Sequence, residues 1–274
     1  MSPGAVLPDP TGPTTAARVA AGLAPLRSIS LGELLATAEL QTRRDDKFLV
    51  PLDALDRLLE VWHGRLRALT IDGSRLFRYE SVYFDTAELT TYRQHAHGRR
   101  RRVKVRTRTY LDSEQCLLEL KFVGSHGETV KDRYPHPVEQ RFELSEPVRT
   151  LLAQRLTSTV EVGGLRPVIS TRYRRATMVD VETGNRITCD VDLRFCDDTH
   201  QRSGPTGVVV LESKALAPAR ALESELRLLG LRPLSLSKYC VGMALLDPRL
   251  PANRWNRELR RHFDWTPVRS GRAS

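Results

Sequence analysis

The sequence is poor in the residues that several classes of site require. Aromatic residues make up 6% of the 274-residue chain, whereas proteins that bind single-stranded nucleic acid stack its bases on aromatic side chains. None of the four cysteines stands in a Cys-x-x-Cys pair, which argues against a zinc site. No apolar run approaches the length of a transmembrane helix, and no lysine or arginine precedes Arg18, unlike a secretory signal. We therefore expect a cytoplasmic protein with reduced thiols and no nucleic-acid partner.

Positive charge, by contrast, is in excess. The chain has 43 lysines and arginines against 33 aspartates and glutamates, a formal net charge of +10. This balance favours an anionic partner, such as phosphate, polyphosphate, nucleic acid or an acidic membrane surface, without choosing between them. The remaining composition, 40% hydrophobic and 28% charged, is ordinary for a globular protein.

Composition along the chain predicts three regions. Residues 1–28 are rich in Pro, Gly, Ala and Thr, which predicts a flexible leader. Residues 29–247 contain the patterned strands and helices and are predicted to form one domain. Residues 248–274 are rich in arginine and include Trp255 and Trp265, which predicts a basic tail at the surface.

Between residues 99 and 133, charged and apolar residues alternate. Side chains alternate across a β-strand, so alternating residues share one face. The cations predicted to share a face are Arg102, Lys104, Arg106 and Arg108. For one strand, a charged face in water explains this. The pattern recurs, however, in the other predicted strands: Gln41–Val50, Arg78–Asp85, Pro167–Val179, Arg186–Arg194 and Gly207–Ala215. A further short strand is predicted at Phe142–Leu144.

Amphipathic helices are predicted between the strands. They are expected at Ser30–Leu40, after Pro51, within Thr86–His97, after Ser145, after Pro218 and at Ser237–Leu246. An antiparallel sheet that closes on itself would pack its outer face on these helices and hold the charges in its lumen. Surplus cations in a lumen need a bound polyanion, and a few carboxylates there suit Mg²⁺ or Mn²⁺. The predicted fold class is therefore α+β, an antiparallel β-tunnel with a charged lumen and helices packed outside.

Nine short motifs lie in order between about residues 41 and 246. They are Asp45-x-Lys47-Phe48, Tyr83-Phe84-Asp85, Lys104-x-Arg106-x-Arg108, Glu119-x-Lys121, Lys131-x-Arg133, Tyr173-x-Arg175, Arg186-Ile187-Thr188-x-Asp190, Glu212-x-Lys214 and Ser237-Lys238-Tyr239. In this order they resemble the VTC domain, the polyphosphate polymerase branch of the CYTH-like triphosphate tunnel metalloenzymes. The resemblance implies a closed tunnel of about eight antiparallel strands.

The resemblance also implies a site. By motif position, phosphate would be bound by Lys47, Arg106, Arg108, Lys121, Lys131, Arg133, Tyr173, Arg175, Arg186, Ser237 and Lys238. Catalysis would fall to Arg106, Arg108, Lys121 and Lys238 among them, and Glu212 would hold Mn²⁺ or Mg²⁺. The implied partners are ATP or another nucleoside triphosphate and polyphosphate, with any membrane partner on a separate chain.

One departure bears on the reaction. The hydrolytic relatives open with Glu-x-Glu-x-Lys, whereas this chain has Arg43 in the first glutamate's place, followed by Asp45 and Lys47. This favours a polymerase that moves the terminal phosphate of a nucleoside triphosphate onto polyphosphate. A tripolyphosphatase or nucleoside triphosphatase with the same tunnel and a non-catalytic polyphosphate sensor remain alternatives, and the role of Asp45 is open.

Other charged residues have two interpretations. Asp190 and Asp192 are either metal ligands or, as we favour, partners that orient tunnel arginines. The cluster Arg99–Arg102 is either a rim that attracts anions or a solvated turn. His95 and His97 are expected at the surface.

Overall fold

The computed structural model describes residues 15–38, 43–123, 129–156, 160–216 and 221–268. The strands are β1 (Arg27–Ile29), β2 (Arg43–Pro51), β3 (Leu66–Leu69), β4 (Phe77–Asp85), β5 (Val103–Tyr110), β6 (Gln115–Val123), β7 (Thr129–His136), β8 (Arg166–Asp180), β9 (Arg186–Cys196), β10 (Gln201–Ser203) and β11 (Val208–Leu216). The helices are α1 (Thr15–Leu23), α2 (Leu31–Ala38), α3 (Leu52–Trp62), α4 (Thr90–Ala96), α5 (Glu146–Arg155), α6 (Ala221–Leu228), α7 (Lys238–Leu246), the 3₁₀ turn η1 (Asn253–Trp255) and α8 (Asn256–His262).

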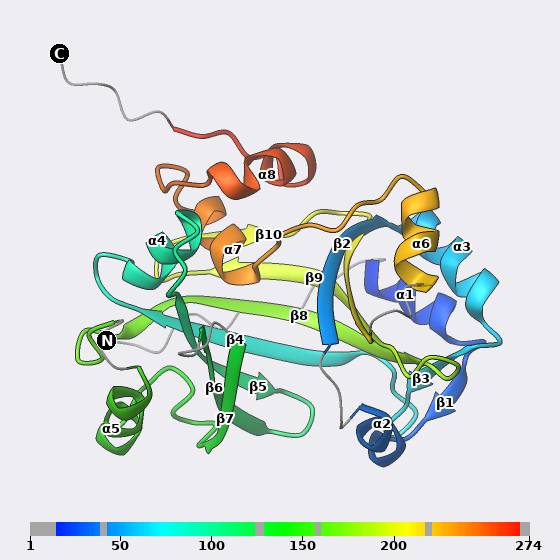
Figure 1. The fold of residues 1–274 in the computed structure, drawn as a ribbon, viewed down its shortest axis with the longest axis horizontal. Helices are drawn as coiled ribbons and strands as arrows, with labels where there is room; N and C mark the ends of the chain where they lie inside the picture. The colour runs from blue at the N-terminus through cyan, green and yellow to red at the C-terminus, as the bar shows by residue number, and fades with distance from the viewer. Residues whose placement is uncertain (1–14, 39–42, 124–128, 157–159, 217–220, 269–274) are drawn as a thin grey trace.

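The strands form a single sheet whose main path runs β2-β11-β9-β8-β4-β5-β6-β7, with every neighbouring pair antiparallel. Beside this path, β3 pairs with β8, β10 pairs with β9, and β1 runs parallel to β3. The predicted antiparallel sheet with helices around it is thus confirmed. The predicted closed barrel is not: among the described residues no backbone ladder joins the two ends of the path, β2 and β7, both of which lie towards the viewer in Figure 1.

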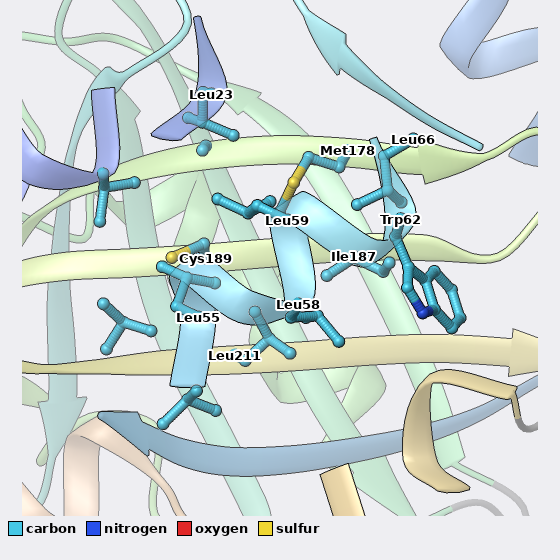
Figure 2. Close-up of a cluster of buried hydrophobic side chains, with 14 of the residues drawn as sticks. Leu23, Leu55, Leu58, Leu59, Trp62, Leu66, Met178, Ile187, Cys189 and Leu211 are labelled. Carbon is cyan, nitrogen blue, oxygen red and sulfur yellow. The ribbon is translucent and has the colours of Figure 1, made fainter. Parts of the chain in front are cut away.

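The outer face of the sheet packs against α1 and α3. Pro51 precedes α3, where its missing N–H costs nothing, and the helix buries Leu55, Leu58, Leu59 and Trp62 along one stripe. These side chains meet Met178 of β8, Ile187 and Cys189 of β9, and Leu211 of β11, as Figure 2 shows. A second outer cluster, around Phe84, Val105 and Leu118, packs under α5.

The opposite face of the sheet packs against α7. On β2, Phe48 and Val50 belong to the α3 cluster, whereas Leu49 between them belongs to the α7 cluster, as the period of two requires. Every residue of α7 from Tyr239 to Leu246 is buried, which is typical of a helix that is apolar all round. In Figure 1, α7 and α8 lie together at the upper left, apart from α1 and α3 at the right. The helix therefore occupies one end of the face that carries the strand cations.

Three local predictions differ from the structure. Residues 15–28, assigned to a flexible leader, contain α1 and most of β1, because Ala16, Val19 and Leu23 line one face of a helix and are buried against α3. The C-terminal region packs onto the domain, with Trp255 and Trp265 buried. Residues 142–144 form no strand. The first 14 and last six residues lie outside the described residues.

The helices in the described residues are short, and none of them has the length and hydropathy needed to cross a bilayer.

Candidate functional site

The strand cations line a cavity of about 480 Å³ on the face of the sheet that α7 partly covers. Its basic lining residues are Lys47, Arg102, Lys104, Arg106, Arg108, Lys121, Lys131, Arg133, Arg175, Lys214, Lys238 and Arg254. Its acidic lining residues are Asp45, Glu119, Asp132 and Glu212. Twelve cations thus face four carboxylates in one cavity, and this surplus of positive charge attracts anions.

Eleven of the twelve predicted site residues line this cavity: Lys47, Arg106, Arg108, Lys121, Lys131, Arg133, Tyr173, Arg175, Glu212, Ser237 and Lys238. Arg186, the exception, begins β9 opposite Lys214, and the lining includes Lys214 but not Arg186. The prediction omitted Lys104 and Lys214, although the alternation of β5 and β11 places both on the inner face. It also omitted Arg254, for which the strand pattern carries no signal because it comes from the C-terminal region.

Glu119 on β6 organises three of the arginines. In register, Arg106 of β5 and Arg133 of β7 flank it on either side. Arg106 donates to Glu119 Oε2 from Nε at 2.8 Å and from Nη2 at 2.5 Å, Arg133 Nε lies 3.2 Å from Oε1, and Arg108 Nη2 lies 3.6 Å from Oε2. Burial alone would raise the pKa of Glu119, but Arg106 and Arg108 hold it at about 2. The carboxylate therefore stays ionised and fixes the direction of the guanidiniums.

Asp190 on β9 does the same for a second group of cations. Its side chain is fully buried and accepts from Arg175 Nε at 2.6 Å and Nη2 at 2.8 Å, and from Lys238 Nζ. Burial opposes its ionisation, but Arg175 and Lys238 hold its pKa at about 2. Asp190 is thus a partner that orients cations, as favoured from the sequence. Asp192 does not join it, because the β8–β9 register shifts beside Arg172 and Asp192 adopts φ +52.

Two carboxylates and two lysines lie together on the paired strands β11 and β2. In register, Glu212 opposes Lys47 and Lys214 opposes Asp45. Glu212 Oε1 lies 3.4 Å from Lys47 Nζ and 3.8 Å from Lys214 Nζ. Burial would raise the pKa of Glu212, but these lysines hold it well below its usual range. Asp45 Oδ1 is buried without a hydrogen-bond partner among the described residues.

The start of α7 closes one side of the cavity. Ser237 is the N-cap of α7, and its Oγ accepts from Cys240 N at 3.3 Å and from Lys104 Nζ at 2.9 Å. Lys238 Nζ lies 4.7 Å from the centre of the Tyr173 ring. The next residue, Tyr239, donates its hydroxyl to the buried Asp85, whose carboxylate also accepts from backbone N–H groups at the start of α4. The helix is thereby held in the position that presents Ser237 and Lys238 to the cavity.

Burial lowers the pKa values of two lysines in the cavity. Burial lowers the pKa of Lys104 to about 8, and the neighbouring charges of Lys121 and Arg106 contribute. Burial also lowers the pKa of Lys214 to about 8, although Glu212 and Asp45 oppose the shift. Such shifts arise where cations are crowded and desolvated without enough counter-charge.

The predicted surface position of His95 is wrong. It was expected at the surface, but it lines the cavity and its Nε2 lies 3.1 Å from the carbonyl oxygen of Val103. Burial, together with Lys104, lowers its pKa to about 3. The ring is therefore neutral at physiological pH and adds no charge to the cavity.

The cavity offers few ligands for a metal ion. Within the described residues, no group of three or more His, Cys, Asp or Glu side chains is placed to hold one. Glu212 and Asp45 supply two carboxylates. That donor set fits Mg²⁺ or Mn²⁺, because such ions are commonly held by one or two carboxylates together with phosphate oxygens of the substrate.

Comparison with known proteins gives one family match. The family model described as the VTC domain matches residues 42–247, well over half of the chain. No curated protein matches the sequence significantly. Among solved structures, a candidate adenylate cyclase from Bacillus halodurans is 14% identical, with a TM-score of 0.47 over 72% of this chain and 94% of that one. A candidate adenylyl cyclase from Hippeastrum, described as having a dominant triphosphatase activity, is 17% identical, with a TM-score of 0.49 over 74% and 96% of the respective chains. At these values neither structure indicates an activity for this chain.

Proposed function

The chain belongs to the VTC domain family, and on that premise we propose that it is a polyphosphate polymerase. It would transfer the terminal phosphoryl group of ATP, or of another nucleoside triphosphate, onto a polyphosphate chain inside the cavity, with Mn²⁺ or Mg²⁺. The observation that carries the proposal is the charge of the cavity, in which twelve cations face four carboxylates. A phosphoanhydride chain supplies anionic oxygens at every phosphorus, so it is the kind of ligand that balances this surplus.

The reaction moves one phosphoryl group. A terminal oxygen of the polyphosphate chain attacks the γ-phosphorus, the bond between that phosphorus and the β–γ bridging oxygen breaks, and the nucleoside diphosphate leaves with the electron pair. The chain gains one phosphate. Charge accumulates on the oxygens around the transferred phosphorus, so the protein contributes chiefly position and electrostatic stabilisation.

Arg106, Arg108, Lys121 and Lys238 are proposed to neutralise the transferred group. Arginine suits this role because it is always charged and binds two phosphate oxygens at once. Glu119 and Asp190 hold Arg106 and Lys238 in place before substrate arrives, which reduces the reorganisation needed in the transition state.

The other predicted phosphate-binding residues that line the cavity are proposed to hold the rest of the phosphate chain: Lys47, Lys131, Arg133, Tyr173, Arg175 and Ser237. Arg186 is left out of this set because it does not line the cavity. When bound, a divalent ion would offset the negative charge of the phosphates, and Glu212 and Asp45 are the residues that would hold it. The four free cysteines support a reducing compartment such as the cytoplasm.

Polymerase is favoured over hydrolase by the inner face of β2. A hydrolase places a water in line with the phosphorus, commonly with metal and carboxylates. The residues of β2 that line the cavity are Asp45 and Lys47, one carboxylate and one cation. The side chain of Arg43 lies outside the described residues.

The experiment that separates polymerase from hydrolase measures where the γ-phosphate of ATP is transferred. The protein is incubated with γ-labelled ATP and Mn²⁺ or Mg²⁺, with and without a short polyphosphate primer, and the label is measured in polymer and in free orthophosphate. We expect more label in polymer than in orthophosphate. Arg175→Ala should lose the activity, whereas Arg57→Ala, an exposed position on α3 at the opposite face, should keep it. Orthophosphate as the sole product would assign a hydrolase, and tight tripolyphosphate binding without turnover would assign a sensor.

A further inference from the structure

Arginines continue from the cavity onto the surface. They come from two segments: the turn before β5, with Arg99, Arg100, Arg101 and Arg102, and the η1–α8 segment, with Arg254, Arg257, Arg260 and Arg261. We call these eight residues the arginine rim. Arg102 and Arg254, one from each segment, line the cavity. All the others are exposed. Each of the two segments therefore reaches the candidate site through one arginine.

The two segments are held together by packing. Tyr92 of α4 donates its hydroxyl to the carbonyl oxygen of Pro251 at 3.0 Å, and its ring lies 6.2 Å from that of Trp255. Arg254 Nη1 lies 3.5 Å from the carbonyl oxygen of His95. Gly98 has φ +66, and a side chain there would begin 2.8 Å from Arg254 Nη1. The η1–α8 segment is thus docked beside the turn.

The rim arginines form no ion pairs in the described part of the chain, although Glu258 and Asp264 lie in and just after α8. Within the residues that the structure describes, none of the eight arginines has a carboxylate oxygen within the 4.0 Å of an ion pair. Arg102 and Arg254 donate to backbone carbonyl groups, and Arg260 donates to the amide of Asn256. An isolated exposed arginine is ordinary. Eight such arginines lie in two segments that each contribute one residue to the cavity lining, so they extend the positive field of the cavity onto the surface and attract an anion larger than the cavity.

The proposed reaction produces such an anion. Each turnover lengthens the chain, whereas a cavity of about 480 Å³ is the size of a site for one small ligand. A growing polymer must therefore extend outside it. Guanidinium groups bind phosphate oxygens two at a time, which suits a flexible chain of phosphates. The scarcity of aromatic residues, 6% of the chain, makes a nucleic acid a poorer match.

We propose that the arginine rim binds the part of a long polyphosphate chain that extends beyond the cavity. This inference rests on the proposed function, since it takes the ligand of the cavity to be polyphosphate. The rim would then favour long chains over short ones, because only long chains reach it. Retention of the product at the rim would also let one enzyme add several phosphates before release.

The test compares ligand lengths. Dissociation constants for tripolyphosphate and for long-chain polyphosphate are measured with wild type and with a rim variant, Arg257→Ser/Arg260→Ser/Arg261→Ser. A control variant, Arg27→Ser/Arg57→Ser/Arg166→Ser, removes the same charge from exposed positions elsewhere. We expect the rim variant to lose about tenfold in affinity for the long chain and less than about twofold for tripolyphosphate, with a shallower salt dependence for the long chain only. The control should change neither value by more than about twofold.

Any other result would contradict the proposed role of the arginine rim. Equal losses for both ligands, no loss for either, or an equal loss in the control would show that the rim contributes only general charge. If the rim variant lost binding to RNA or to anionic lipid vesicles but kept its affinity for long polyphosphate, the rim would serve another polyanion and the proposal would be overturned. A wild-type protein that bound neither tripolyphosphate nor long polyphosphate would overturn the proposed function itself, which separates the two failures.

Discussion

Lys131 on β7 donates to Asp45 on β2, with 3.1 Å between Nζ and Oδ2. This ion pair spans the two ends of the strand path, which no backbone ladder joins among the described residues. A side-chain contact thus connects the two edges at a place where a closed barrel would have hydrogen bonds between strands. Both residues also line the cavity, so the group that connects the edges is one that phosphate would compete for.

The first prediction concerns this pair. Asp45→Asn should change the free energy of unfolding by less than about 1 kcal/mol, because the Lys131 side chain is 47% exposed and such pairs contribute little. In metal-free buffer it should raise the affinity for tripolyphosphate about two- to tenfold, since an anion is removed and Lys131 is released. Calorimetry and chemical denaturation measure the two effects. Weaker binding that appears only when Mn²⁺ is present would support the proposed role of Asp45 in holding the metal, and weaker binding without metal would contradict this prediction.

The faces of the strands could be predicted because alternation is local. Arg106, Arg108 and Lys121 belong to strands long enough for the period of two to be read directly, and they lie where it places them. Asp192 breaks the rule. Alternation assigns it to the face of Asp190, but the shift in register between β8 and β9 turns it away. Whether a bulge forms depends on the pairing with the partner strand, so it cannot be predicted from the sequence of one strand alone.

Long-range contacts limited the rest of the prediction. Arg254 reaches the cavity because Trp255 packs beside Tyr92, more than 150 residues earlier in the chain, and no spacing in the sequence records that contact. The pairing of Asp45 with Lys131 is of the same kind. The helix α1 was missed for a different reason, because an Ala-rich amphipathic segment has the same composition as a flexible one.

The second prediction concerns stability. Tripolyphosphate at millimolar concentration should raise the melting temperature, because a ligand that binds only the folded state stabilises it by mass action. It should also relieve repulsion among the cavity cations. Sulfate at equal ionic strength is the control and should produce a smaller shift. If tripolyphosphate has no effect, the assignment of the cavity to phosphate chains is wrong.

The third prediction follows from Lys104 and Lys214, whose pKa values lie near 8. As pH rises from about 7 to about 9, both lose protons, so the affinity for tripolyphosphate should fall. The stability of the ligand-free protein should instead rise with pH. Between about 8 and the ordinary lysine value of 10.5, the folded state binds fewer protons than the unfolded state, so removing protons favours folding. Titration calorimetry and thermal melts across this range measure both. A Lys104→Arg variant should bind with a weaker pH dependence, and equal pH dependence in the two proteins would contradict this account.

The last prediction assigns the metal carboxylate. Glu212→Gln should abolish turnover yet leave tripolyphosphate binding within about tenfold of wild type. The lysines and arginines that bind phosphate are kept, and only a metal ligand is lost. Metal-free affinity should be kept or raised, since Lys47 and Lys214 lose their nearest anion, and added Mn²⁺ should no longer tighten binding. Glu119→Gln is the contrasting variant. Its carboxylate is engaged by Arg106, Arg108 and Arg133, so its loss should disturb phosphate binding and leave the Mn²⁺ dependence intact. If Glu212→Gln responds to Mn²⁺ and turns over like wild type while Glu119→Gln does not, the two carboxylates have exchanged roles, and the metal site lies between β5 and β7 rather than between β2 and β11.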